Sequence, residues 1–498
     1  MKYDHLKSGT DIRGVASPLG GKEVTLTEEA VYDLVSAFTV WYVNRFEKDP
    51  AALTFAVGRD SRITGEKIGE TVRKALIEAG VSVLDCGLAS TPAMFMTTVD
   101  LAADAAVQIT ASHHPFDRNG LKFFLPSGGL DALELAEVVA IADRGESLIC
   151  NTRGQVKAVD YMRQYAAGLR RMICEAVGKR EEEKPLAGYH LIVDAGNGAG
   201  GFYAYEVLEK LGADITGSQF LEPDGRFPNH IPNPENEEAM ASICAAVKAN
   251  RADLGIIFDT DVDRAGCVGA DGSEINRNRL IALAAYIAAE GRKDFTVVTD
   301  SVTSDGLKTY IEKTLGGTHY RYRRGYKNVI DKAKELCAQG VNCPLAIETS
   351  GHAALRENYF LDDGAYLVTK IVIELAKGHS IEKLLEPLAL PAEETELRFA
   401  IKAEDFAAYG NEVLEKLNAY AAARPDYKLA DDSREGVRIS TKNGFFLLRL
   451  SVHDPVMPIN FESNVPGGIR EDINGIRAFF KQFDLLDTSV LDDHAMLK

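Results

Sequence analysis

One pattern, a short apolar strand followed by a polar loop with glycine and then a helix, occurs three times in this chain of 498 residues. The first copy begins with the apolar run at residues 54–57, after which Ile68 and Val72 follow at helical spacing. The second and third copies begin at residues 191–193 and 295–298. Strands that alternate with helices form sheets covered by helices, so this pattern predicts three related α/β units.

The pattern changes after the polar break at residues 391–395. From there the sequence predicts, in order, a strand at 397–401, a helix at about 403–423, strands at 437–441, 445–450 and 456–461, and a helix at about 471–483. We therefore predict three similar α/β domains with mixed sheets and a C-terminal α+β domain. The predicted domains are residues 1–155, 156–272, 273–392 and 393–498.

Composition limits the partners and the compartment. A formal net charge of −18 argues against nucleic acid or an anionic membrane as a partner, because both would be repelled. No run of about 18 uncharged apolar residues predicts a membrane span, and the first residues show no apolar signal region. Seven cysteines without a Cys-x-x-Cys pattern are typical of reduced thiols. We expect a cytoplasmic protein, monomeric or homodimeric, that acts on small molecules.

An anionic substrate would need positive charge concentrated locally on so acidic a chain. Basic residues do cluster near the loops described below. They are Arg13, Arg59, Arg62, Lys122, Arg264, Arg321, Arg323, Arg324, Lys327 and Arg449.

The apolar run at residues 105–109 predicts a buried strand that ends in a tight turn before Pro115. We expect Ser112 to be exposed on this turn, beside His113 and His114, with Lys122 ten positions further on. A hydroxyl that can carry a phosphate, imidazoles that can hold it and a cation that can move a proton indicate phosphoryl chemistry. A capped strand end without a chemical role is the alternative.

A second stretch follows the apolar run at residues 254–258, where Asp259, Asp261 and Asp263 are spaced by two and Arg264 comes next. Such carboxylates can converge on one hard cation of the Mg²⁺ or Ca²⁺ type. Without a cation they would raise one another's pKa values. An EF-hand is excluded, because the sixth loop position is Arg264 instead of glycine. A solvated acidic turn is the alternative.

Two more loops carry candidate binding groups. Glu348, Ser350 and His352 alternate acceptors and donors after an apolar strand, a pattern suited to neighbouring sugar hydroxyls, although an ordinary polar turn is equally compatible with it. Near the end of the chain, Arg449 can bind phosphate oxygens with two parallel hydrogen bonds, and Ser451 can complete the site.

Taken together, these loops resemble the α-D-phosphohexomutase superfamily, the phosphomannomutase/phosphoglucomutase enzymes, from about residue 8 to residue 462. The most specific element is the Ser112-His113-His114-Pro115 turn combined with the three aspartates. The resemblance implies four domains around a central cleft. It implies an enzyme that interconverts hexose 1-phosphates and hexose 6-phosphates of mannose and/or glucose, with Mg²⁺ as cofactor and a hexose 1,6-bisphosphate as intermediate.

The resemblance also implies roles for individual residues. Ser112 would carry the phosphoryl group and, with Asp259, Asp261 and Asp263, hold Mg²⁺. Lys122 and Arg13 would assist proton transfer or charge stabilisation, with His113 and Arg264 beside them. Glu348 and Ser350 would bind the 3- and 4-hydroxyls of the sugar. The remaining implied substrate-binding residues are His352, Lys327, Arg324, Arg449, Ser451 and His453.

Several positions depart from the family pattern. His114 stands where asparagine is common, Thr260 and Val262 where glycines are common, Ile347 where glycine is common, and Asn460 where arginine is common. These departures concern substrate choice and phosphate binding more than the reacting groups. Since glucose and mannose differ at the 2-hydroxyl, the Glu348 and Ser350 pair does not separate them, and we expect dual specificity.

Three alternatives remain at this point. A phosphoglucosamine mutase would use the same loops on an amino sugar. A haloacid-dehalogenase-type phosphatase would use Asp259 as the nucleophile and Asp261 as the acid/base, although some 250 residues precede the motif. A sugar-phosphate sensor without catalysis is the third alternative, and it would be expected to lack Ser112 or one of the aspartates.

Overall fold

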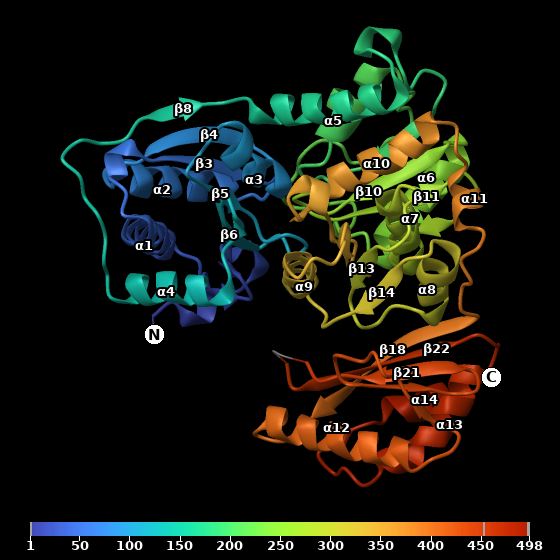
Figure 1. The fold of residues 1–498 in the computed structure, drawn as a ribbon. Coiled ribbons are helices and arrows are strands. Elements are labelled where there is room, and N and C mark those ends of the chain that lie inside the picture. Colours follow the sequence, from blue (N-terminus) through green and yellow to red (C-terminus); the bar gives the residue numbers. More distant parts are fainter. Residues whose placement is uncertain (1, 452–453, 496–498) are drawn as a thin grey trace. The chain divides into compact units, whose positions relative to one another are not determined.

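The computed structural model describes residues 2–451 and 454–495 (Figure 1). The chain forms two compact units, each described by itself below. The first contains Met1–Asn276, Ser350–Ala353 and Leu361–Ile381, and the second contains Arg277–Thr349, Ala354–Phe360 and Glu382–Lys498.

The first sheet has the strand order β1-β2-β6-β5-β3-β4-β8, with β7 paired to β6. Strands β5, β3, β4 and β8 are parallel neighbours. Strand β6 pairs antiparallel with β5 and with β2, so the sheet is mixed. Its strands are β1 (Lys7–Ser8), β2 (Asp11–Val15), β3 (Thr54–Arg59), β4 (Ser82–Leu88), β5 (Ala105–Ile109), β6 (Arg118–Leu125), β7 (Gly128–Gly129) and β8 (Val156–Ala158).

Helices α1 (Glu28–Phe46), α2 (Gly65–Glu78), α3 (Thr91–Asp100) and α4 (Ala132–Asp143) cover this sheet. Thr27 begins α1 by accepting a hydrogen bond from the Ala30 N–H. Leu34 and Phe38 of α1 are fully buried, and Phe38 stacks on Phe123 of β6 with ring centroids 4.4 Å apart. Each such buried side chain contributes about 1.5–3 kcal/mol, which fixes the strands that carry the Ser112 turn.

The second sheet, also in the first unit, has the order β12-β11-β10-β9, with bounds β9 (Leu191–Asp194), β10 (Leu254–Phe258), β11 (Ala265–Gly269) and β12 (Glu274–Ile275). Helices α5 (Tyr161–Val177), α6 (Glu237–Asn250) and α10 (Gly364–Ala376) pack around it. The helix predicted after the 196–201 loop is present as π and 3-10 turns over Tyr203–Leu208 and Glu209–Leu211, and Gly212 ends it with φ 93°. Because Phe258 pairs with Ala265, the three aspartates lie in the hairpin turn between β10 and β11.

In the second unit, β14 (Thr318–Arg321), β13 (Thr296–Thr299) and β15 (Leu345–Ile347) are parallel neighbours in that order. Helices α7 (Arg277–Ala289), α8 (Asp305–Thr309) and α9 (Tyr326–Ala338) accompany them. A short strand β16 (Ala353–Leu355) follows along the chain, and β17 (Leu361–Asp362) precedes α10.

The C-terminal sheet has the order β19-β20-β21-β22-β18-β23 and is antiparallel throughout. Its elements are β18 (Glu393–Ile401), α12 (Phe406–Ala422), β19 (Lys428–Leu429), β20 (Val437–Ser440), β21 (Gly444–Leu448), β22 (Val456–Ser463), α13 (Gly468–Phe480), β23 (Leu486–Asp487) and α14 (Val490–Ala495). Buried residues of α12 and α13 pack on this sheet in one core.

The predicted fold class is confirmed: three α/β domains with mixed sheets precede a C-terminal domain with an antiparallel sheet. The break predicted at residues 391–395 is partly wrong. Strand β18 already begins at Glu393, because β22 extends to Ser463 and pairs with it. The four domain boundaries stay a prediction. Among the described residues the seven cysteines are free thiols, and no helix is long and apolar enough to cross a membrane.

Candidate active site

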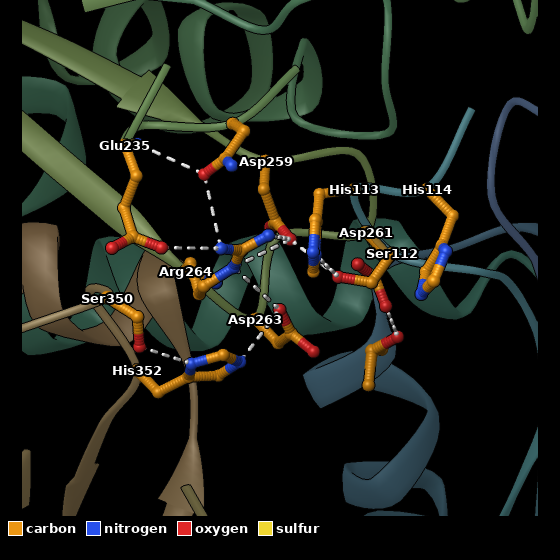
Figure 2. A network of polar contacts seen from close by, with 12 residues as sticks. Ser112, His113, His114, Glu235, Asp259, Asp261, Asp263, Arg264, Ser350 and His352 are labelled. Atoms are coloured by element: carbon orange, nitrogen blue, oxygen red, sulfur yellow. Dashed lines mark hydrogen bonds and ion pairs between the residues drawn. The ribbon is translucent and has the colours of Figure 1, made fainter. Parts of the chain in front are cut away.

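The Ser112 turn connects β5 to β6 in the first unit, and the acidic hairpin meets it there (Figure 2). The Ser112 hydroxyl donates a hydrogen bond to Asp259 Oδ2 at 3.1 Å and lies 3.3 Å from His113 Nδ1. The serine has φ 47°, and its N–H donates to Thr110 Oγ1 at 2.8 Å. The sequence places Ser112 and Asp259 147 positions apart, and the fold brings their side chains into contact.

Ser112 is buried, with 4% of its surface exposed, so the prediction of an exposed serine is wrong for this state. The reason is that the acidic hairpin, whose aspartates are themselves buried, packs directly against the serine side chain. The hydroxyl therefore faces carboxylates instead of bulk water.

Arg62, which follows β3, fixes the shape of the Ser112 turn. Its guanidinium donates hydrogen bonds to the carbonyl oxygens of Ser112, His114, Pro115 and Arg118, the last three at 2.7, 2.8 and 2.9 Å. Four carbonyls that face one guanidinium hold the turn in one conformation, which orients the serine. The prediction that Arg62 supplies charge to a substrate is therefore wrong: its guanidinium is fully buried and serves the backbone.

Asp60 completes this arrangement. Its carboxylate lies 3.3 Å from Arg62 Nε and accepts a hydrogen bond from Thr110 Oγ1 at 2.7 Å. Burial raises the pKa of Asp60 to about 6, although Arg62 and Thr110 act to lower it. The pair is fully buried, so each charge depends on the other.

We expect Arg62→Met to lower the free energy of unfolding by roughly 3–5 kcal/mol, because it leaves Asp60 as an uncompensated buried charge. Activity should fall with stability, since the carbonyls of the Ser112 turn lose their common donor. Urea unfolding followed by circular dichroism measures the change. Arg153→Met is the matched control, because Arg153 is 68% exposed and pairs loosely with Glu78, and it should change little. Equal stability of both variants would contradict this role.

The acidic hairpin is fully buried: Asp259 and Asp261 are 0% exposed and Asp263 is 1% exposed. One carboxylate oxygen from each lies within 4.8 Å of the others, a spacing that could hold a metal ion. Among the described residues, Asp261 Oδ1 and Asp263 Oδ1 have no hydrogen-bond partner despite their burial. Buried oxygens without donors are costly, and a cation would satisfy them.

The turn that holds the aspartates is strained. Val262 has φ 67°, a conformation that a β-branched residue rarely adopts, and its side chain is fully buried. Strain of this kind costs about 1–3 kcal/mol and persists where surrounding contacts impose it. One such contact is the hydrogen bond from the Gly364 N–H to the Val262 carbonyl oxygen at 3.0 Å.

Two cations partly neutralise the three aspartates. Lys122 Nζ donates to Asp263 Oδ2 at 2.5 Å and lies 3.3 Å from Asp261 Oδ2. Arg264 donates through Nε and Nη2 to Asp259 Oδ2, both at 3.2 Å. Lys122 thus reaches the acidic site from β6, the strand that follows the Ser112 turn.

Lys122 and Arg264 change the pKa values of the aspartates that they contact. Burial raises the pKa of Asp259 well above its usual value, and Asp263 adds to the rise while Arg264 opposes it. For Asp263, burial acts to raise the pKa, but Lys122 and His352 outweigh it and hold the pKa below its usual value. The sequence predicts that carboxyl groups without a cation would raise one another's pKa values. Asp263 does not meet that condition, because Lys122 contacts it directly.

The imidazoles beside Ser112 are neutral at neutral pH in this state. Burial, aided by Arg264, lowers the pKa of His113 to about 2, and burial, aided by Arg13, lowers the pKa of His114 to about 3. The two rings stack with centroids 5.3 Å apart. A neutral imidazole still offers one N–H donor. Arg13 lies nearby on β2, where its guanidinium donates to Asp11 at 2.7 Å.

The predicted sugar loop is divided between the two units. Ser350 and His352 belong to the first unit, where Ser350 Oγ lies 2.9 Å from His352 Nδ1 and His352 Nε2 lies 3.7 Å from Asp263 Oδ1. Glu348 belongs to the second unit, where its carboxylate accepts the Gly325 N–H at 2.6 Å. Gly351 lies between Ser350 and His352 and has φ 94°, and a Cβ there would lie 2.8 Å from the Ala265 carbonyl oxygen.

The predicted phosphate loop lies in the second unit. Arg449 is buried, and its Nη2 lies 3.3 Å from Glu396 Oε2 and 3.2 Å from Asn460 Oδ1. Arg324 Nη1 lies 3.5 Å from the same Glu396 oxygen. Burial acts to raise the pKa of Glu396, but the two arginines outweigh burial, and the pKa lies below its usual value. A carboxylate of the chain itself therefore contacts both of the proposed phosphate-binding cations.

The other predicted binding residues lie as follows. Ser451 Oγ accepts the Asp454 N–H at 3.2 Å, and Lys327 pairs with Asp331 along α9 at 2.6 Å. His453 lies outside the described residues. Arg321, counted among the cations available to a substrate, instead binds Asp305 at 2.9 Å and is 3% exposed, so that prediction is wrong.

Three domain descriptions match most of the chain. They are phosphoglucomutase/phosphomannomutase alpha/beta/alpha domain I over residues 7–147, domain II over residues 163–272 and domain III over residues 276–390. The chain belongs to the phosphoglucomutase/phosphomannomutase family. Membership of the wider α-D-phosphohexomutase superfamily, predicted from the loops, is thereby confirmed.

Relatives of this family are similar over nearly their whole length. A phosphoglucomutase of Neisseria gonorrhoeae is 30% identical over 94% of this chain and 95% of its own. A phosphomannomutase/phosphoglucomutase of Pseudomonas putida is 30% identical over 93% of this chain and 92% of its own. A solved structure of a phosphoglucomutase/phosphomannomutase family protein from Burkholderia thailandensis superposes with a TM-score of 0.78 at 25% identity, over 96% of this chain and 97% of that one.

These similarities make the chain an enzyme of the phosphohexomutase type, as predicted, and do not favour the phosphatase alternative. Within the family site, Arg62 is the residue whose role the sequence did not reveal. The fold alone shows the reason: β3 and β5 are parallel neighbours, and loops that follow neighbouring parallel strands meet at one sheet edge.

Proposed function

We propose that the chain interconverts hexose 1-phosphates and hexose 6-phosphates, of mannose and/or glucose, through a phosphorylated Ser112 and a hexose 1,6-bisphosphate. The observation that carries the proposal is the 3.1 Å contact between the Ser112 hydroxyl and the buried acidic hairpin. A phosphoryl group on that oxygen would stand beside carboxylates that can hold a cation and beside Lys122. Phosphoryl transfer depends mainly on such positioning and charge neutralisation.

Mg²⁺ fits the donor set, because Asp259, Asp261 and Asp263 supply only oxygens and two of those oxygens are buried without donors among the described residues. When bound, the ion would withdraw charge from the oxygen that links Ser112 to phosphorus. Arg264 keeps Asp259 oriented, and its own charge limits how far the pKa of Asp259 rises.

Lys122 is the group we assign to proton transfer. Its ammonium contacts Asp263 and Asp261 and is close to the strand end that carries Ser112. The ammonium would donate a proton to the Ser112 oxygen as its bond to phosphorus breaks, and the amine so formed would accept the proton of the attacking sugar hydroxyl. The return direction reverses both transfers. His113, Arg13 and Arg264 would stabilise the charge of the transferred group.

Glu348, Ser350 and His352 are proposed to bind sugar hydroxyls, and Arg324, Lys327, Arg449, Ser451 and His453 to bind the phosphate that is not reacting. The same phosphate site would serve both ends of the bisphosphate, so the intermediate can return its second phosphate to Ser112. We further propose that the enzyme acts in the cytoplasm as a monomer or homodimer, with the four domains bounded as predicted.

A coupled assay with glucose 1-phosphate, mannose 1-phosphate and glucosamine 1-phosphate tests the substrate proposal. The residues proposed to bind the sugar address the 3- and 4-hydroxyls, where glucose and mannose agree. We therefore expect kcat/KM values for these two sugars within about tenfold of each other, a difference of about 1.4 kcal/mol. Turnover of glucosamine 1-phosphate alone would show a phosphoglucosamine mutase instead, and turnover of none would contradict the proposal.

Arg449→Ala should raise KM about tenfold or more while kcat changes little, because a phosphate contact of this kind exists in both the ground state and the transition state. Steady-state kinetics with glucose 1-phosphate separates the two constants. Arg477→Ala is the control, since Arg477 lies on α13 and pairs with Asp492 of α14, outside the predicted phosphate loop. A fall in kcat with unchanged KM would place Arg449 in the chemical step instead.

Glu396→Gln should have the opposite effect on substrate binding. Its carboxylate contacts Arg449 and Arg324, so a substrate phosphate must compete with it, and glutamine keeps the shape without the charge. We expect KM to fall about threefold to tenfold. Glu394→Gln, a change at an exposed residue of the same strand, should leave KM unaltered. An increased KM for Glu396→Gln would show that the carboxylate aids binding.

A further inference from the structure

A buried histidine, His230, lies in the first unit, in the loop between Leu211 and α6, and belongs neither to the acidic hairpin nor to the Ser112 turn. The residue is 6% exposed. Its Nε2 lies 2.9 Å from Asp194 Oδ2 and 3.1 Å from Asp194 Oδ1, at the end of β9. Its Nδ1 lies 3.0 Å from the carbonyl oxygen of Ile231. Both ring nitrogens therefore face oxygens that accept hydrogen bonds.

This arrangement requires a proton on each ring nitrogen. A backbone carbonyl oxygen can only accept, so Nδ1 must donate to Ile231. The oxygens of Asp194 also accept the Gly196 N–H at 2.8 Å and a side-chain N–H of Gln219 at 2.6 Å, as an ionised carboxylate does, so Nε2 must donate as well. A neutral imidazole carries one N–H and an imidazolium carries two. The contacts therefore fit an imidazolium paired with a carboxylate.

The surroundings of the His230 ring favour its charged form. Burial acts to lower its pKa, but the hydrogen bond and charge of Asp194, the carbonyl of Ile231 and the charge of Glu238 outweigh burial, and the pKa lies above its usual value. The charged groups that act on the ring are thus Asp194, from β9, and Glu238, from α6. Phe220 covers the ring edge-on, with centroids 5.2 Å apart.

The ion pair lies where two loops meet, the segment at residues 229–235 and the glycine loop at residues 196–201. Gly196 has φ 53°, and a Cβ there would lie 2.7 Å from Pro232 Cβ, so the two loops approach too closely for a side chain. The glycine loop also contacts the acidic hairpin, because the Ala199 N–H donates to the Thr260 carbonyl oxygen at 2.8 Å.

The segment that begins beside His230 also reaches Arg264. Asn233 Oδ1 accepts a hydrogen bond from Arg264 Nη1 at 3.1 Å, and Glu235 Oε2 lies 3.7 Å from the same nitrogen. Arg264 in turn donates to Asp259 of the acidic hairpin. His230 is therefore connected to the hairpin twice, through the glycine loop and through the partners of Arg264.

We propose that His230 is a positioning residue whose imidazolium fastens residues 229–235 to Asp194, and that these contacts loosen as the pH rises. The partners of Arg264 loosen with them. A proton that binds more tightly to the folded chain stabilises it fully below the unfolded pKa, about 6.5 for histidine, and this contribution is lost as the pH rises through the higher folded pKa. Between the two values, the equilibrium constant for local opening should rise by up to about tenfold for each pH unit.

Nuclear magnetic resonance of the unaltered full-length protein with isotope-labelled histidines tests the charge of His230. Its ring is recognised by its contacts with the ring of Phe220. We expect protons on both ring nitrogens at about pH 6, and a titration midpoint above about 6.5. A neutral ring at about pH 6, or a midpoint at or below about 6.5, would overturn the proposal.

Hydrogen exchange followed by mass spectrometry tests the consequence for the two loops. In the unaltered protein, the protection factors of peptides that cover residues 195–200 and 229–236 should fall severalfold from about pH 6.5 to about pH 8.5, after correction for intrinsic exchange rates. His230→Gln should show low protection at both pH values, because glutamine carries no titrating charge. A fall of the same size in His230→Gln, or full protection of that variant at about pH 6.5, would overturn the proposal.

His379→Gln is the matched control. The imidazole of His379 also pairs with a carboxylate, that of Glu374 at 2.7 Å, but it is 46% exposed, so the variant should keep the pH dependence of the unaltered protein. The inference goes beyond the proposed function and does not depend on it. Because neither experiment measures turnover, an inactive protein with the expected His230 titration would refute the proposed function alone.

Discussion

Ser112→Ala is expected to lower the mutase kcat/KM by roughly 10³–10⁶-fold, the range found when a catalytic nucleophile is removed. The Ser112 hydroxyl directly contacts Asp259, whereas the Thr110 hydroxyl of the same turn donates to Asp60 and accepts the Ser112 N–H. The change also removes the oxygen that lies 3.3 Å from His113 Nδ1. A coupled assay with glucose 1-phosphate and the hexose 1,6-bisphosphate measures the loss.

Ser61→Ala is the matched control for this change. Ser61 lies in the loop after β3, next to Arg62, and belongs to neither the acidic hairpin nor the Ser112 turn. Its replacement should leave kcat/KM within about twofold, since it removes one hydroxyl and nothing from the proposed chemistry. Near-normal turnover of Ser112→Ala, in a protein that unfolds at the normal urea concentration, would refute the phosphoserine mechanism.

Asp261→Asn is expected to raise the Mg²⁺ concentration for half-maximal activity at least about tenfold, and to lower the maximal rate as well. Asp261 Oδ2 already accepts from Thr91 Oγ1 at 2.5 Å and lies close to Lys122, whereas the buried Oδ1 has no donor among the described residues. The asparagine amide keeps the shape but removes the charge that a hard cation requires.

Magnesium titrations of activity and of binding check this prediction together. Asp271→Asn, a change in the exposed turn between β11 and β12, supplies the control and should reproduce the normal titration. If Asp261→Asn showed an unchanged Mg²⁺ titration, the ion would not be held by the acidic hairpin.

Much of the fold could be predicted because each element has a local signal. Four of the five residues at 105–109 are apolar, on both faces of the strand, as expected for a strand covered on both faces, and β5 has the predicted bounds Ala105–Ile109. The three aspartates follow β10 directly, so their turn was also visible in the sequence. Strand β18 was assigned four residues too short, because its polar start becomes a strand only by pairing with β22.

The details that were missed depend on tertiary contacts. Nothing in the sequence shows that Arg62 donates to four carbonyls of another loop, or that Lys122 contacts Asp263 and lowers its pKa. Likewise, Glu348 and Ser350 are two positions apart, yet they belong to different compact units. Sequence spacing predicts which residue types gather near a strand end, whereas their partners are decided by which strands and hairpins become neighbours.

Phosphoenzyme trapping tests the central claim most directly. The protein would be incubated with Mg²⁺ and a hexose 1,6-bisphosphate labelled with ³²P in both phosphates, then quenched in acid and digested for peptide mapping. We predict a label that resists acid and hydroxylamine, is released by alkali and maps to Ser112. A hydroxylamine-labile label on Asp259, or no covalent label at all, would contradict the account.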